Sequence, residues 1–149
     1  MYVSVIGGDS TTCTERDCEI AVELGRGIAR IGATLVSGGR GGVMEAVCKG
    51  AKMEGGTTIG ILPSSDRGEK NQYVDHAVVT GIGSMRNALV VMNGDVVVAV
   101  DGGYGTLSEI SLAAAYGKKI LGIGTWDMDI VEMYEDVESL LIDLKKQLR

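Results

Sequence analysis

Clusters of glycine at the ends of apolar runs constrain the fold of this chain more than any other feature. Glycine accounts for 23 of the 149 residues. It gathers at residues 7–8, 38–42 and 102–105, each time after a short apolar segment and before a segment with helical character. Glycine lets the backbone turn tightly and approach a ligand closely. The pattern therefore predicts repeated strand–turn–helix units, and it shows no collagen-like period.

Predicted strands and helices alternate along the whole chain. The strands are expected at residues 2–6, 33–37, 57–62, 75–80, 95–100 and 119–123, and the helices at residues 14–31, 43–53, 85–93, 107–116 and 137–148. Most of these strands are apolar on both faces, which is typical of a parallel sheet covered by helices on each side. We therefore predict an α/β fold, a Rossmann-like three-layer sandwich with a mostly parallel sheet, as one nucleotide-binding domain over residues 1–149.

This topology predicts where a ligand binds. Right-handed crossovers bring the carboxyl ends of parallel strands to one edge of the sheet. The three glycine clusters should therefore open on that edge, where ligands bind at the point at which the strand order reverses.

Composition argues against several classes of function. The net charge is −6, and no run of lysine or arginine provides the basic surface that a nucleic acid polymer requires. No segment has the pattern of a signal peptide or the apolar length of a membrane span. Cys13, Cys18 and Cys48 have no metal-ligand spacing, so we expect three reduced thiols in a cytoplasmic protein without a metal or a cofactor.

Residues 101–109, with the sequence DGGYGTLSE, carry the strongest functional signal. A strand that passes through glycines into a helix offers free backbone N–H groups and a helix dipole to an anion such as phosphate. Glu109 lies one turn inside the predicted helix, where an acid beside an anion site suggests chemistry. The spacing of Thr106 and Glu109 also fits a capping box. The sequence leaves both interpretations open.

The glycine clusters match neither of two common nucleotide motifs. Residues 39–41 and 103–105 lack the third glycine of the dinucleotide fingerprint, and no Walker A sequence occurs. These differences argue against an NAD-dependent enzyme and against an ATP-hydrolysing one.

Several further residues are candidates for contact with a ligand. Arg40 lies in a glycine loop, and Arg86 lies at the start of a predicted helix. A cation at a helix start gains nothing from the helix dipole, so the position of Arg86 favours contact with an anion. Tyr104 can stack on a ring or shield the turn, and Ser10 can bind ribose or cap a helix. His76, the only histidine, is expected to be a packed or edge residue rather than a base. The phosphate- or ligand-binding candidates are Gly8, Ser10, Gly38, Gly39, Arg40, Gly41, Gly102, Gly103, Tyr104, Gly105 and Thr106.

Three segments together resemble the LONELY GUY (LOG) family of the Rossmann-like nucleotide-binding superfamily. They are residues 37–44 (SGGRGGVM), 84–87 (SMRN) and 102–109 (GGYGTLSE). The resemblance implies a phosphoribohydrolase, which cleaves the N-glycosidic bond of a nucleoside 5′-monophosphate to free base and ribose 5-phosphate. It also implies that Arg86 and Glu109 are catalytic, and that the phosphate-binding turn consists of Gly102, Gly103, Gly105 and Thr106. It further implies that the chain forms a homodimer or higher homo-oligomer.

The sequence departs from the LOG pattern at three positions. Asp101 replaces a typical proline, Asn87 a lysine, and Ser108 the first of two glutamates. The pattern is also similar to a sister branch that includes molybdenum-cofactor carriers, which bind a phosphorylated pterin without catalysis. A nucleotide sensor is a third alternative. The lysine decarboxylase label once given to the family is rejected. Such an enzyme would need a lysine that holds pyridoxal phosphate, but the lysines nearest the motif, Lys118 and Lys119, fall beyond the far end of the helix.

Overall fold

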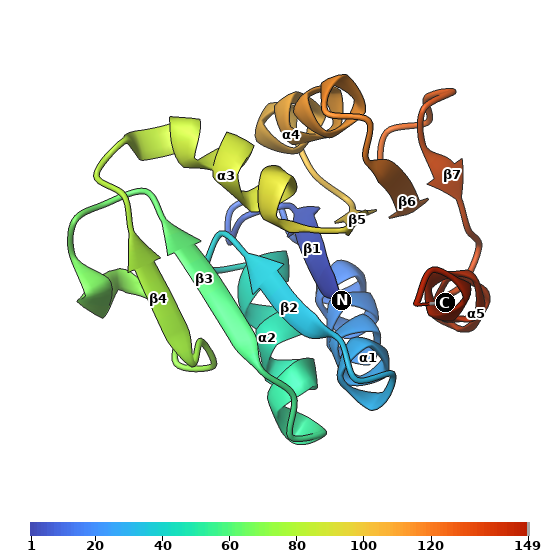
Figure 1. Ribbon diagram of the computed structural model, residues 1–149, viewed down its shortest axis with the longest axis horizontal. Helices are drawn as coiled ribbons and strands as arrows, with labels where there is room; N and C mark the ends of the chain where they lie inside the picture. Colours follow the sequence, from blue (N-terminus) through green and yellow to red (C-terminus); the bar gives the residue numbers. More distant parts are fainter. Residues whose placement is uncertain (149) are drawn as a thin grey trace.

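The computed structural model describes residues 1–148 and shows one seven-stranded sheet in which every pairing is parallel. Arg149, the last residue of the predicted domain, lies outside the described residues. The strand order is β4-β3-β2-β1-β5-β6-β7 (Figure 1). The strands are β1 (Tyr2–Gly7), β2 (Thr34–Ser37), β3 (Thr58–Leu62), β4 (His76–Val79), β5 (Val96–Val100), β6 (Lys119–Ile123) and β7 (Glu132–Met133).

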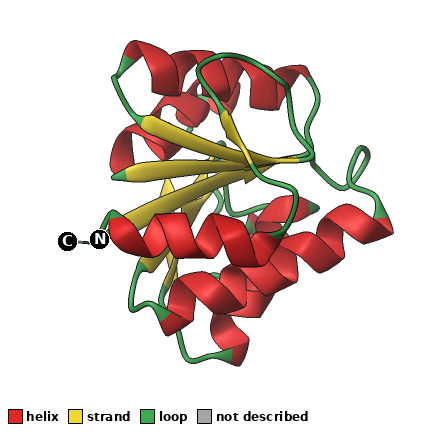
Figure 2. Ribbon diagram, turned by 90° about the vertical axis from the view of Figure 1, so that its right-hand side faces the viewer, coloured by secondary structure: helices red, strands yellow, loops and turns green. Residues whose placement is uncertain are grey.

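Within residues 1–148, five α-helices cover the two faces of the sheet (Figure 2). They are α1 (Glu15–Arg30), α2 (Val43–Met53), α3 (Arg86–Asn93), α4 (Tyr104–Ala115) and α5 (Val137–Lys146), with short 3₁₀ helices η1 (Arg67–Glu69) and η2 (Gly83–Met85). Buried residues of α1, α2 and α5 share one core cluster, and those of α3 and α4 share the other. The predicted three-layer α/β fold is confirmed.

The central strand β5 shows why the apolar runs lack polar alternation. All five of its residues are buried. Val96, Val98 and Val100 enter the core under α1, α2 and α5, while Val97 and Ala99 enter the opposite core. A strand that is covered on both faces must be apolar at every position.

The apolar face predicted for α3 differs from the face that the sheet buries. Val90 and Val91 are fully buried against the sheet, whereas Met85 and Met92 are 74% and 48% exposed. Helical spacing alone groups Met85, Ala88, Leu89 and Met92 on one apolar face, but both methionines of that face are exposed and the other two residues are half-buried. Helical periodicity identified an apolar stripe but could not distinguish it from the neighbouring valines that pack inward.

One further element, the last strand of the sheet, differs from the sequence-based expectation. The last strand, β7, has only two residues and joins the sheet beside β6. So short a segment leaves no periodic pattern to detect.

No helix within residues 1–148 has both the length and the apolar character that crossing a membrane requires.

Candidate functional site

The strand order reverses between β1 and β5, and a cleft of about 260 Å³ opens there. The chain runs outward from β1 through β2 and β3 to β4, and then returns to place β5 on the other side of β1. The cleft is therefore at the location expected for a ligand site in this fold. Its lining includes residues 5–9 and 103–106, together with Thr12, Gly38, Met44, Arg86, Asn87 and Glu109.

The start of α4 forms one wall of the cleft. The helix begins at Tyr104, directly after Gly103, and Gly103 is its N-cap without a side-chain capping bond. The carbonyl of Gly103 accepts the first helical bond from the N–H of Leu107, at 3.1 Å. The N–H groups of Tyr104, Gly105 and Thr106 thus have no acceptor in their own helix. Together with the helix dipole they form a site suited to an anion.

This early helix start decides against the capping box at Thr106 and Glu109. Thr106 is a buried residue inside the helix, not its N-cap. Gly102 has φ of +114°, and a Cβ there would lie 2.2 Å from the hydroxyl oxygen of Thr106. Residue 102 must therefore be glycine for the chain to enter the helix here. Because Thr106 lies inside the helix and is not its N-cap, the capping-box interpretation was wrong.

Asp101 has an unusual backbone conformation at the end of β5. Its φ is +54°, the only positive φ of a non-glycine residue among residues 1–148. Its N–H donates to the carbonyl of Ile123 at 3.3 Å, and its own carbonyl accepts from the hydroxyl of Thr125 at 2.7 Å. Its Oδ2 atom is buried without a hydrogen-bond partner among the described residues. Burial raises the pKa of this carboxyl, and the nearby Asp17 raises it further.

Glu109 lies at the floor of the cleft with little exposure to solvent. Only 8% of the residue is exposed. Burial raises its pKa to about 8, and the positive charge of Arg86 offsets part of that rise. Because a carboxyl with this pKa exists in both protonation states near neutral pH, the residue is suited to proton transfer or to charge stabilisation.

Arg86 is held at the start of α3 by backbone carbonyls. Its Nε donates to Ile61 O at 2.9 Å and one terminal nitrogen to Gly38 O at 3.4 Å, while the other bonds the Oδ1 of Asn87. Burial lowers its pKa, and Glu109 opposes that shift. Arg86 and Glu109 form no ion pair within 4.0 Å. The two charged groups therefore share the cleft while remaining separate.

The loop between β2 and α2 contributes less to the cleft than its glycines suggested. Gly38 lines the cleft, where a Cβ would lie 2.7 Å from a terminal nitrogen of Arg86. Arg40 turns instead to Glu69, with a 3.1 Å ion pair, and Asn71 binds its carbonyl at 2.9 Å. Five of the predicted ligand-binding residues lie outside the lining of the cleft: Ser10, Gly39, Arg40, Gly41 and Gly102. Their contact with a ligand stays a prediction.

Trp126 supports the turn between β5 and α4 and was missed by sequence reasoning. Its Nε1–H donates to the carbonyl of Gly103 at 3.1 Å, and its ring lies 6.1 Å from that of Tyr104. A detectable signal existed: Gly124, Thr125 and Trp126 directly follow β6. They therefore occur at the same edge of the sheet as the other glycine turns.

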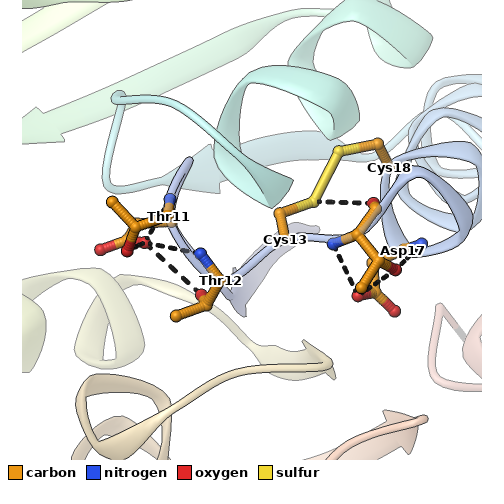
Figure 3. Close-up of a disulfide and its surroundings, with 7 residues drawn as sticks. Thr11, Thr12, Cys13, Asp17 and Cys18 are labelled. Carbon is orange, nitrogen blue, oxygen red and sulfur yellow. Dashed lines mark hydrogen bonds between the residues drawn. A yellow bond between two sulfur atoms is a disulfide. The ribbon is translucent and has the colours of Figure 1, made fainter.

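Cys13 and Cys18 form a disulfide beside the cleft, with Cα atoms 6.6 Å apart (Figure 3). The expectation of three reduced thiols was therefore wrong for this pair. The capping box of Thr14 and Asp17 fixes how the chain enters α1. Cys13 directly precedes the N-cap and Cys18 is the fourth residue of the helix, and these two positions lie side by side. Cys48 is free and buried, and burial raises its pKa to about 11. No group of three or more potential metal ligands occurs among residues 1–148.

A model of the SLOG cluster4 family matches residues 1–148. The chain belongs to the SLOG cluster4 family. An uncharacterized protein of Archaeoglobus fulgidus is 41% identical over 83% of this chain and 80% of its own length. A probable cytokinin riboside 5′-monophosphate phosphoribohydrolase of rice is 34% identical over 81% of this chain, but this SLOG protein matches only 54% of the rice sequence. The resemblance to the LOG family is confirmed.

Two solved structures resemble this SLOG protein over nearly their whole length. The molybdenum cofactor binding protein of Rippkaea orientalis has a TM-score of 0.93 and 35% identity, covering 99% of this chain and 97% of the other. The molybdenum cofactor carrier protein of Chlamydomonas reinhardtii has a TM-score of 0.91 and 35% identity, with the same coverage of both chains. Both branches named in the sequence-based resemblance therefore occur among the similar proteins.

Proposed function

We propose that this SLOG protein binds a nucleoside 5′-monophosphate in the cleft and hydrolyses its N-glycosidic bond. The observation that carries the proposal is the position of Glu109, a buried carboxyl beside the unpaired first-turn N–H groups of α4 and opposite Arg86. A phosphate on those N–H groups brings the ribose of the nucleotide into the cleft that Glu109 lines. The phosphoribohydrolase names of similar proteins support this substrate class.

The residues of the cleft suit the chemistry of this bond. Hydrolysis adds water to C1′ of the ribose and releases the base with a proton, giving free base and ribose 5-phosphate. Positive charge develops on the ribosyl group as the bond breaks, and an ionised Glu109 would stabilise it. Arg86, fixed by two backbone carbonyls, would orient the substrate or assist departure of the base.

Release of ribose 5-phosphate tests the catalytic part of the proposal. The protein is incubated with AMP and with N6-modified AMP, and ribose 5-phosphate is assayed. Glu109→Gln should abolish release, because the amide cannot carry the negative charge. Glu138→Gln on the exposed side of α5 serves as the matched control and should act like the parent chain. Equal release by the parent chain and by Glu109→Gln would rule out this role for Glu109.

A second candidate function is non-catalytic carriage of a phosphorylated pterin such as molybdenum cofactor. Asp101 is the observation that favours it, because a proline, typical at this position of the LOG pattern, cannot adopt φ of +54°. The similar carrier structures also match nearly the whole chain. Binding of a phosphorylated pterin without release of ribose 5-phosphate from AMP would support carriage. Binding of AMP without any binding of pterin would exclude it.

We further propose that the protein acts in the cytoplasm as a homo-oligomer and that its partner is a small ligand rather than a nucleic acid polymer. The net charge of −6 opposes binding along a polyanion. A single phosphate needs only local donors such as those at the start of α4.

A further inference from the structure

Tyr104 combines high exposure with a position at the ligand cleft. It is the first residue of α4 and lines the cleft, yet it is 84% exposed. Its backbone N–H belongs to the anion-binding turn, while its ring extends from the same residue into solvent. An aromatic ring gains free energy when another flat surface covers it. The residue can therefore contact two different parts of one ligand.

Trp126 lies next to the ring of Tyr104. The two ring centroids are 6.1 Å apart with an angle of 34° between the ring planes. The indole cannot shift freely, because it donates to the carbonyl of Gly103 and packs against the core under α3 and α4. The neighbouring Thr125 bonds the carbonyl of Asp101 at 2.7 Å. The segment after β6 thus fixes both the turn and the aromatic pair.

We propose that Tyr104, supported by Trp126, is a stacking platform for a planar heterocycle of the ligand. The phosphate binds the backbone N–H groups of residues 104–106, and the flat ring lies on the side chain of Tyr104. The site therefore selects phosphorylated ligands that carry a planar ring, such as a purine or a pterin, over a sugar phosphate alone. This inference rests on the phosphate position in the proposed function, but it does not depend on hydrolysis.

The cleft itself gives a reason for a platform outside it. Its volume of about 260 Å³ is at the small end for a ligand site. The lining also includes the polar side chains of Arg86 and Glu109, which are both more buried than Tyr104. A phosphate and a sugar use this polar interior well, whereas a flat ring is better placed on the aromatic surface at the opening.

Binding measurements on three ligands test the platform. Calorimetry gives the affinities of AMP, neopterin monophosphate and ribose 5-phosphate for the parent chain, Tyr104→Ala and Tyr104→Phe. Tyr116→Ala, at the opposite end of the same helix, is the matched control. Trp126 is the only tryptophan, so its fluorescence reports a ring that stacks on the neighbouring Tyr104.

The platform predicts a loss confined to ligands with a ring. Tyr104→Ala should weaken the binding of AMP or of neopterin monophosphate by about ten-fold or more. It should leave the affinity for ribose 5-phosphate within about two-fold of the parent value. Tyr104→Phe and Tyr116→Ala should bind like the parent chain. Ligands with a ring should change Trp126 fluorescence more than ribose 5-phosphate does. The comparison of AMP with neopterin monophosphate shows which heterocycle the site prefers.

Three results would overturn the platform. They are equal weakening of all three ligands by Tyr104→Ala, no weakening of any, and a parent chain that binds AMP and neopterin monophosphate no better than ribose 5-phosphate. Absence of hydrolysis with the ring selectivity intact would defeat the enzymatic proposal alone. Absence of binding of all three ligands would defeat the phosphate site, and the platform with it.

Discussion

The buried carboxyl of Glu109 links the chemistry of the cleft to the stability of the fold. The residue follows a helix start rich in free N–H groups, but its side chain lies too deep to cap them. Burial disfavours its charged form, and Arg86 compensates only in part. With a pKa of about 8 the carboxyl is mostly protonated at pH 7. A carboxyl with so perturbed a pKa in a cleft is typical of functional sites.

Glu109→Gln should change how stability depends on pH. Between its ordinary pKa of 4.5 and about 8, the folded protein keeps a proton on Glu109 that the unfolded chain releases. The free energy of unfolding should therefore fall as pH rises through this range, by at most about 1.4 kcal/mol per pH unit. Glu109→Gln should lack this contribution, as urea unfolding at pH 5 and pH 8 can show. Identical changes in the two proteins would contradict the raised pKa.

Hydrolysis of AMP should follow the ionisation of the same carboxyl. If ionised Glu109 stabilises the ribosyl cation, kcat/KM should rise through pH 7 to 8 and level off above the pKa of about 8. This parameter reports the groups of the free enzyme. A value that falls across this range would mean that the protonated carboxyl is the active form, contrary to the assigned role.

The turn between β5 and α4 is the element that organises the site. Gly102, with φ of +114°, and Asp101, with φ of +54°, direct the chain straight from a buried strand into a helix. Thr125 and Trp126 hold the turn from the segment after β6. The proposed anion site therefore depends on two segments that follow neighbouring strands rather than on one.

Replacement of Asp101 should separate backbone from side-chain effects. Asp101→Pro should destabilise the protein by about 3 kcal/mol or more, because proline cannot adopt this φ and lacks the N–H that bonds Ile123. Asp101→Asn should be at least as stable as the parent chain, since asparagine tolerates positive φ and removes a poorly solvated carboxyl. Thermal unfolding compares the two variants. A proline variant as stable as the asparagine variant would contradict the observed turn.

The order of elements was predictable because strand and helix patterns are local, and the glycine turns mark their boundaries. The position of Arg40 was not predictable, because its pairing with Glu69 depends on a loop 29 residues away. The contact of Trp126 with Gly103 likewise spans 23 residues. The sequence predicted that α4 begins at residue 107, whereas it begins at Tyr104. Its first three residues include Gly105 and the β-branched Thr106, and both residue types disfavour a helix.

The molecule as a whole presents an apolar surface beside α3. Ile82, Met85, Met92 and Val78 are 48%, 74%, 48% and 47% exposed. Exposed apolar patches of this kind often mark sites of protein association. The surface adjoins β3 and β4 at one side of the sheet, where α3 contacts β3 (Figure 1). It is therefore the best candidate for contact between two copies of the chain.

Self-association should depend on this surface. The parent chain should sediment as a dimer or higher oligomer, and Met85→Glu should shift it toward monomer, because a charge would be buried at the contact. Met53→Glu, at an exposed methionine that ends α2 on the opposite face, is the control and should leave association unchanged. A parent chain that sediments as a monomer at all concentrations would contradict the proposed homo-oligomer.

Comparison of AMP with adenosine by calorimetry isolates the phosphate group. The two ligands share base and ribose, so their difference in affinity measures what the first-turn N–H groups of Tyr104, Gly105 and Thr106 contribute. Charge-assisted hydrogen bonds to a phosphate there should make AMP bind about a hundred-fold or more tightly than adenosine. Equal affinity of AMP and adenosine would show that α4 does not bind a phosphate.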